Sequence, residues 1–88
     1  MLRFYVFFVI GENINAIGKE AFYNTPSLKE IQFDSTRITD LKTYQEIFYK
    51  SGSQTEGIDL KIGDQVEKIP AYLFSSSGDY SVKLKSIQ

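Results

Sequence analysis

Apolar and polar residues follow one another in an order that recurs along the chain. Its clearest occurrence is residues 9–33, VIGENINAIGKEAFYNTPSLKEIQF. Ile31 and Phe33 are two residues apart, so in an extended strand both point to one side, while Glu30 and Gln32 point to the other. Before them, residues 18–24 suit one helical or 3₁₀ turn, which the polar cluster at 24–27 ends. The stretch therefore predicts a short turn followed by a strand.

The same order occurs twice more, with matching apolar positions. Phe22, Phe48 and Phe74 follow one another at a constant interval, and Thr25, Ser51 and Ser77 keep the same interval. A repeat of this length is typical of a solenoid, in which each unit buries its apolar face against its neighbours. We therefore predict a single α/β repeat domain over residues 1–88. It would have about three irregular coils, with small stacked strands on one side and helical or irregular turns opposite. The expected units are about 8–33, 34–62 and 63–88.

The opening of the chain predicts a first strand that is apolar on both faces. Residues 8–11 align with 60–63, so Phe8 and Ile10 are expected to face the core. A signal peptide is the alternative for this stretch, but the apolar run is short and no cleavage site of small residues follows. The strand is also far too short to span a bilayer.

Phe7 and Val9 lie at the places that Asp59 and Lys61 hold in the aligned strand. Two apolar side chains on the outer face mark an interface or an aggregation hazard. We expect them to be covered either by a second copy of the chain, which would make a homo-oligomer, or by an upstream repeat. A fragment of a longer repeat array is accordingly expected.

One stretch of the middle copy has the spacing of a helix. Leu41, Tyr44, Ile47 and Phe48 fall on one side of a helical turn, which predicts a helix of about two turns over 41–49. The small and polar residues at 51–57 predict a surface loop, and residues 75–79 the matching loop of the third copy.

Composition excludes several classes of function. The 88 residues are 42% hydrophobic, enough for a modest core, and the net charge of −1 argues against a nucleic-acid-binding protein. The chain has neither cysteine nor histidine, so disulfides, zinc and histidine-activated nucleophiles are not expected. Residues 75–77 are three serines without a glycine elbow, and the acidic residues are spread over separate units. We predict no catalytic residue, cofactor or metal.

The strings IGENINAIGKEAFYNTPSLKEIQF (10–33) and IGDQVEKIPAYLF (62–74) resemble the BspA-like leucine-rich repeats of bacterial surface proteins. The resemblance covers about residues 8–88. It departs from the family pattern in two places. Thr25, Ser51 and Ser77 stand where the family often has cysteine, and residues 42–46 lengthen the middle copy.

The resemblance implies a short leucine-rich-repeat solenoid that binds a protein partner without catalysis. It also implies an extracellular or cell-surface location and a host or matrix protein as the partner. The stacked strands would place polar side chains on one outer face, which is the expected contact face. The alternative is that these positions only face solvent and that the repeats are a structural spacer. The residues of the expected contact face are Glu30, Gln32, Asp59 and Lys61, continued by Ser86 and Gln88.

Overall fold

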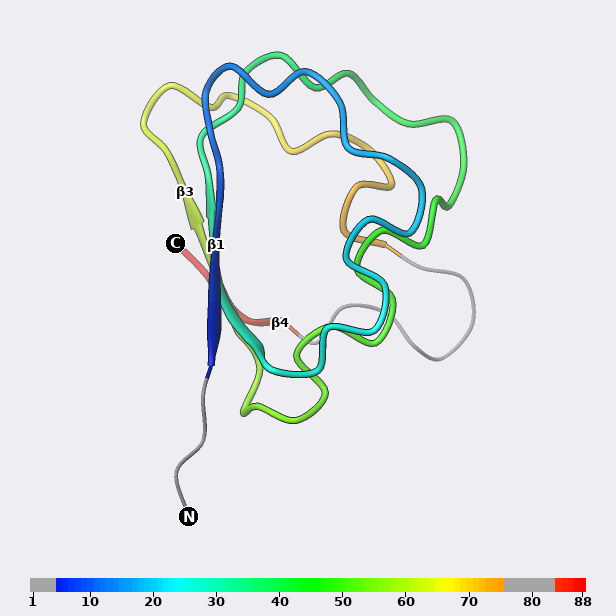
Figure 1. Cartoon of the computed structure of the whole chain (residues 1–88). Coiled ribbons are helices and arrows are strands. Elements are labelled where there is room, and N and C mark those ends of the chain that lie inside the picture. The colour runs from blue at the N-terminus through cyan, green and yellow to red at the C-terminus, as the bar shows by residue number, and fades with distance from the viewer. Residues whose placement is uncertain (1–4, 76–83) are drawn as a thin grey trace.

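Four short strands form one parallel sheet. The computed structural model describes residues 5–75 and 84–88 of the chain. The strands are β1 (Val6–Ile10), β2 (Leu28–Phe33), β3 (Ile58–Ile62) and β4 (Leu84–Ile87). They are parallel and lie in the order β1-β2-β3-β4, so each strand pairs with the next one in the sequence. Long irregular segments return the chain from the end of one strand to the start of the next (Figure 1). This path is that of a repeat solenoid.

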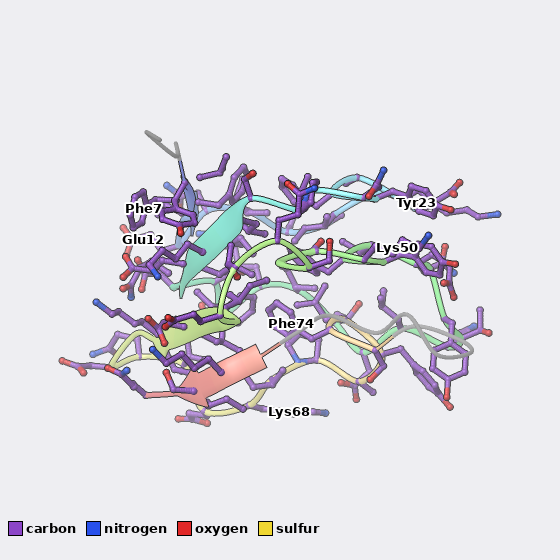
Figure 2. The ribbon with its side chains drawn as sticks, turned by 90° about the horizontal axis from the view of Figure 1, so that it is seen from below. Phe7, Glu12, Tyr23, Lys50, Lys68 and Phe74 are labelled. Atoms are coloured by element: carbon purple, nitrogen blue, oxygen red, sulfur yellow. The ribbon has the colours of Figure 1, made fainter. Side chains whose placement is uncertain are left out.

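We call β1 with residues 11–27 the first coil, β2 with residues 34–57 the second, and β3 with residues 63–75 the third. Figure 2 shows the coils one above another, with the strands at one side and the turns at the other. The register confirms the alignment expected for the first strand. Phe7 pairs with Glu30, which pairs with Asp59, and Val9 pairs with Gln32, which pairs with Lys61.

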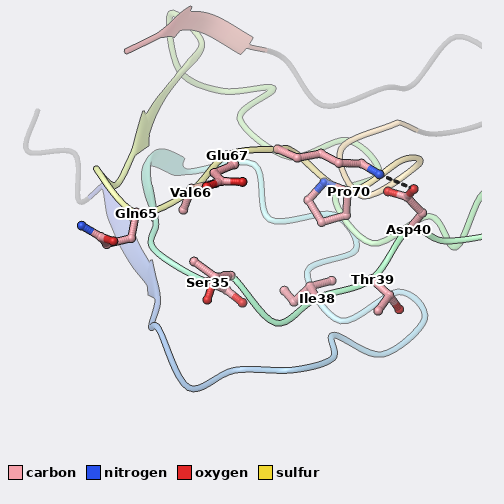
Figure 3. Close-up of a pocket in the computed structure, with 10 residues that line it drawn as sticks. Ser35, Ile38, Thr39, Asp40, Gln65, Val66, Glu67 and Pro70 are labelled. Carbon is pink, nitrogen blue, oxygen red and sulfur yellow. Dashed lines mark hydrogen bonds and ion pairs between the residues drawn. The ribbon is translucent and has the colours of Figure 1, made fainter.

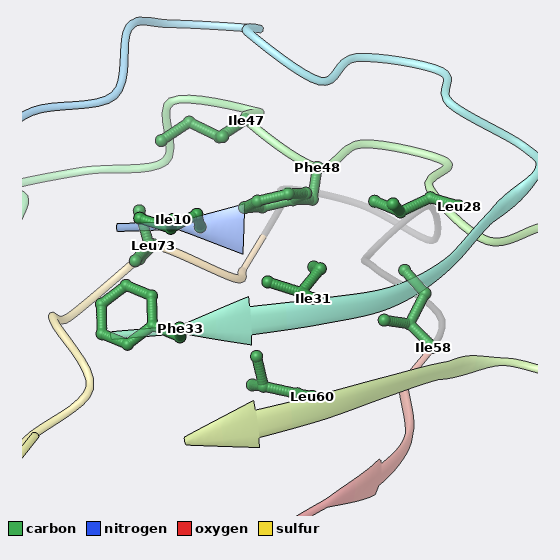
Figure 4. Close-up of a cluster of buried hydrophobic side chains, with 9 residues drawn as sticks. All are labelled: Ile10, Leu28, Ile31, Phe33, Ile47, Phe48, Ile58, Leu60 and Leu73. Carbon is green, nitrogen blue, oxygen red and sulfur yellow. The ribbon is translucent and has the colours of Figure 1, made fainter. Parts of the chain in front are cut away.

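The core lies between the sheet and the turns, and apolar side chains from every coil contribute to it (Figure 4). Its aromatic part is a ladder of three rings, one from each coil. Phe22 stacks on Phe48 with ring centroids 5.1 Å apart, and Phe48 stacks on Phe74 at 5.0 Å. These three positions are therefore equivalent, as their constant interval in the sequence predicts. The fully buried members of the core are Ile10, Leu28, Ile31, Phe33, Ile47, Phe48, Ile58, Leu60 and Leu73.

The prediction of a helix over 41–49 is wrong. This segment is irregular, and the described residues contain no helix. A helix would use its backbone groups within the segment, whereas here they bond to neighbouring coils. The carbonyls of Gln45, Ile47 and Tyr49 accept hydrogen bonds from the first coil, and the N–H of Leu41 donates to Ala71. Ile47 and Phe48 are both buried, because successive residues of this irregular segment face the interior.

The turn predicted at 18–24 is present without being helical. The N–H of Ala21 donates to Gly18, and that of Tyr23 donates to Glu20. Glu20 and Asn24 have φ values of 57° and 55°, in the left-handed region that a right-handed helix excludes. We call these left-handed residues corners. They recur one repeat later, at Glu46 (54°) and Lys50 (60°), and Tyr72 (63°) is the residue of the third coil that corresponds to Glu20 and Glu46.

Three isoleucines of the repeat pattern are exposed. Ile14 lies in the first coil, Ile69 in the third and Ile87 in β4, with exposed fractions of 41%, 36% and 64%. All three belong to the outermost parts of the described stack, where only one side is covered by another coil. An apolar position in such a coil has the right spacing but lacks the neighbour that would bury it.

Ser51 is buried at the position where the resembling family often has cysteine. Its Oγ lies 2.8 Å from Thr25 Oγ1, and both hydroxyls lie 3.0 Å from the carbonyl oxygen of Phe22. Each hydroxyl has one proton, so only two of these three contacts can be hydrogen bonds at any moment. The pair joins the first coil to the second beside the phenylalanine ladder. Ser77, the third member of the series, lies outside the described residues.

Replacing this hydroxyl should weaken the contact between two coils. We expect Ser51→Ala to lower the free energy of unfolding by about 1–2 kcal/mol, because a buried hydrogen-bonding group loses its partner. Urea denaturation followed by circular dichroism measures the change. Ser53→Ala is the matched control, since Ser53 lies close by in the same loop and is exposed. Equal effects of the two substitutions would show that the buried hydroxyl contributes nothing specific.

Candidate interaction surface

The outer face of the sheet carries the residues expected to make contacts. Glu30, Gln32, Asp59 and Lys61 lie there side by side on β2 and β3, as the register shows. Their side chains also bond to one another and to their neighbours. Lys61 Nζ lies 3.0 Å from Glu30 Oε1, the amide of Gln32 donates to Asp34 at 2.7 Å, and Ser86 donates to Asp59 at 2.8 Å. Over β2 to β4 this face is therefore a network of half-buried polar groups that satisfy each other.

The same face is apolar over β1. Phe7 and Val9 are 63% and 64% exposed, and they occupy the two outward positions of the strand. Tyr5 and Val6 extend the apolar area, with Lys29 Nζ 4.8 Å from the centre of the Tyr5 ring. Water contact with so much apolar surface is unfavourable, by about 25 cal/mol for each Å². Burial by a partner would therefore lower the free energy most over β1.

A hollow lies at the side of the solenoid, between residues 35–40 of the second coil and 65–70 of the third (Figure 3). Its volume is about 500 Å³. Asp40, at its rim, already has two partners: Lys68 Nζ lies 2.5 Å from Oδ2, and the backbone N–H of Ala71 donates to Oδ1 at 2.9 Å. This carboxylate fastens the second coil to the third.

The contacts of Asp40 predict an effect of pH. The hydrogen bond from Lys68 and that from the Ala71 N–H hold the pKa of Asp40 below its ordinary value of 3.8. Since the pKa is lower in the folded state, the stabilisation is fully present above pH 3.8 and is lost as the pH falls through the folded-state pKa. The group is exposed, so salt should screen the attraction.

We therefore expect Asp40→Asn to lose stability at neutral pH and to converge with the unsubstituted chain at low pH. Urea denaturation across the acid range, with and without added salt, measures this. Asp64→Asn is the control, because Asp64 is exposed and no ion pair joins it to another described residue. A difference that persists unchanged at the lowest pH would contradict the assignment.

Tyrosines gather on the turns, on the side of the molecule away from the sheet. Tyr23 stacks on Tyr49 with ring centroids 4.7 Å apart, and Tyr44 meets Tyr72 edge to face at 5.0 Å. Tyr23, which follows the ladder residue Phe22 in the sequence, is 45% exposed. These pairings were not predicted. The signal for them is in the sequence, because the two tyrosines of each pair are about one repeat apart. Tyr80 lies outside the described residues.

The described residues provide few groups for chemistry. Over residues 5–75 and 84–88, no three acidic side chains come close enough together to hold a metal ion. The serines at 76 and 77 lie outside the described residues, so the structure does not place them. Within the described part of the chain, no helix has the length and apolar character needed to cross a bilayer.

Comparison with known families decides what kind of solenoid this is. A family model described as "BspA type Leucine rich repeat region (6 copies)" matches residues 5–88. The chain belongs to the BspA-type leucine-rich repeat family. The parallel sheet and the stacked phenylalanines are thus the strands and the core of leucine-rich repeats. Members of this family are typically repeat modules of bacterial surface proteins and are generally not enzymes. No curated protein and no solved structure matches the chain.

Proposed function

We propose that the chain is a non-catalytic, adhesion-type protein-binding module of a bacterial cell-surface protein. The observation that supports this most directly is the open outer face of the parallel sheet. No other described segment covers it, and side chains from all four strands lie along it in register. Leucine-rich repeats commonly mediate protein interactions, which agrees with such a face. The partner would be an extracellular protein of a host or its matrix.

The contact residues that we propose are Glu30, Gln32, Asp59 and Lys61. They offer both charges and an amide on a rigid sheet, so a partner can be selected by complementary charge. The Lys61 side chain is 44% exposed and the Glu30 side chain 30%, which leaves each able to bond outward. The cost of breaking their surface ion pair is only about 0–1 kcal/mol.

A second candidate function is a structural spacer that positions another part of the protein. The network of hydrogen bonds and ion pairs on β2 to β4 favours it, because polar groups that already satisfy each other gain little from a ligand. A spacer needs coils that are joined firmly. The hydrogen bonds that Asp40 accepts from Lys68 and from the N–H of Ala71 join two coils in this way.

Retention on immobilised proteins separates the two functions. Purified extracellular-matrix proteins are fixed to a sensor, and the chain is passed over them at physiological salt. The proposal expects saturable retention that falls at least about tenfold in Glu30→Ala/Lys61→Ala, because both charges at the centre of the face are removed. Lys42→Ala, an exposed lysine on the turns, is the control and should bind normally. No saturable retention on any of the proteins would favour the spacer.

A further inference from the structure

The first coil has an apolar hollow at its uncovered end. It has a volume of about 230 Å³ and is lined by residues of β1 and the first coil alone, none of them charged or polar. Phe8, Ile10, Ala21 and Phe22 are among the residues that line it. Val9, which is on the outer face of β1, also lines the hollow, so the apolar surface continues from that face onto the end of the solenoid.

Ala21 explains why the hollow exists. It comes directly before the ladder phenylalanine of the first coil, at the place that Ile47 holds in the second coil and Leu73 in the third. The side chains of Ile47 and Leu73 are 0% and 1% exposed. Alanine lacks the carbons that fill the equivalent place in those two coils. The hollow is therefore matched to an aliphatic side chain that this coil does not supply.

The backbone of the first coil indicates what could lie against this end. Glu20, Phe22 and Asn24 donate their N–H groups to the carbonyls of Gln45, Ile47 and Tyr49, at 3.0, 2.9 and 2.6 Å. The carbonyls one repeat earlier belong to residues 19, 21 and 23. Within the described part of the chain these three accept no backbone hydrogen bond. This end of the solenoid thus presents acceptors, and beside them β1 has an edge that no described strand pairs with.

The opposite end of the described stack also leaves apolar side chains uncovered. Ile87 of β4 pairs in register with Leu60, which pairs with Ile31, which pairs with Phe8. Ile87 is 64% exposed although Leu60 is buried, so the inward-facing column ends in an uncovered apolar side chain. Ile69 of the third coil is also exposed on this part of the molecule.

We propose that copies of this chain associate head to tail, with β4 of one copy against β1 of the next. In this arrangement the sheet continues in parallel, and Ile87 of one copy extends the column that begins at Phe8 of the other. A two-fold pairing of two first coils would instead set acceptors against acceptors and β1 against β1 in antiparallel orientation. Head-to-tail contact also uses different surfaces on the two copies, so it propagates beyond a dimer unless a ring closes. Association between copies does not depend on the proposed function.

Sedimentation velocity of the whole chain over about a hundredfold range of concentration tests the proposal. We expect species larger than a dimer to grow with concentration. The variant Phe7→Asp/Val9→Lys/Ala21→Glu copies the Asp59–Lys61 pattern onto β1 and places a charge in the hollow. Its association should be weaker by at least about tenfold. Ala21→Glu alone, at an exposed position, serves if the triple variant does not fold. Tyr44→Ser, at an exposed tyrosine on the turns, is the control and should associate normally.

A mixing experiment tests the polarity of the contact. The fluorescently labelled triple variant keeps β4 and the third coil unchanged, so it should co-sediment with an excess of the unsubstituted chain. A labelled variant that stays monomeric in the mixture would overturn the head-to-tail arrangement, and so would growth that stops at a dimer. A chain that remains monomeric throughout would overturn self-association itself, as would variants that associate as strongly as the unsubstituted chain.

Discussion

Phe48→Ala is expected to lower the free energy of unfolding by about 3–5 kcal/mol. The ring is 1% exposed and lies between Phe22 and Phe74 in the ladder, so its removal leaves a cavity that interrupts contact among all three coils. Single domains have only about 5–15 kcal/mol of stability in total. We therefore expect a large part of the chain to be unfolded in Phe48→Ala at room temperature, as circular dichroism with urea denaturation would measure.

Tyr23→Ala is the control for this prediction. Tyr23 also takes part in an aromatic stack, but it is 45% exposed and lies outside the ladder. Its loss should cost about 1 kcal/mol. Phe48→Leu, which keeps most of the apolar volume, should recover much of the stability. Similar losses in Phe48→Ala and Tyr23→Ala would show that the ladder is not the centre of the core.

Gly57→Ala should be the most damaging change to the sheet, at about 2–5 kcal/mol, because it adds both backbone strain and a steric clash. Gly57 has a φ of 122°, which side-chain-bearing residues avoid. An added Cβ would lie 2.8 Å from Lys85 Cβ and 3.1 Å from the Lys85 backbone nitrogen. Because the second of these atoms is backbone, β4 would have to move away from β3. Hydrogen exchange of the amide of Gln88, which donates to Leu60, should become faster than in the unsubstituted chain.

Gly11→Ala is the matched control for Gly57→Ala. Apart from its own residue and its two chain neighbours, no atom lies within 4 Å of the position that its Cβ would take, and its φ is outside the left-handed region. We expect it to be neutral or to stabilise by up to about 1 kcal/mol, because alanine has less freedom in the unfolded chain. A Gly57→Ala protein as stable as Gly11→Ala would contradict the close approach of β3 and β4.

The repeat and its register were predictable because both depend on the order of residues along the chain. The alternation of Ile31 and Phe33 with Glu30 and Gln32 assigns each side chain to a face, and a slip of one position would reverse them all. The constant interval between the three ladder phenylalanines likewise places their rings together. Local pattern and long-range stacking agree at these positions.

The error over 41–49 has a different origin. Helical spacing describes where side chains fall and says nothing about which groups the backbone bonds to. In a solenoid those groups can bond to the adjacent coil, as Gln45, Ile47 and Tyr49 do. The contacts of Asp40 were hidden for a similar reason. Its partners Lys68 and Ala71 lie in the next coil, and many other acidic and basic residues have similar separations along the chain.

The left-handed corners have a consequence for engineering the chain. Glu20 and Asn24 enclose a segment of the same length as that between Glu46 and Lys50, so a single insertion between two corners would displace a ring of the ladder. Elsewhere the coil length already varies, because the chain from Ile10 to its partner Phe33 is shorter than the chain from Phe33 to its partner Ile62. Foreign peptides should therefore be accommodated best between Lys42 and Thr43, two exposed residues in the stretch that lengthens the second coil, where a display scaffold could carry them without disturbing the stack.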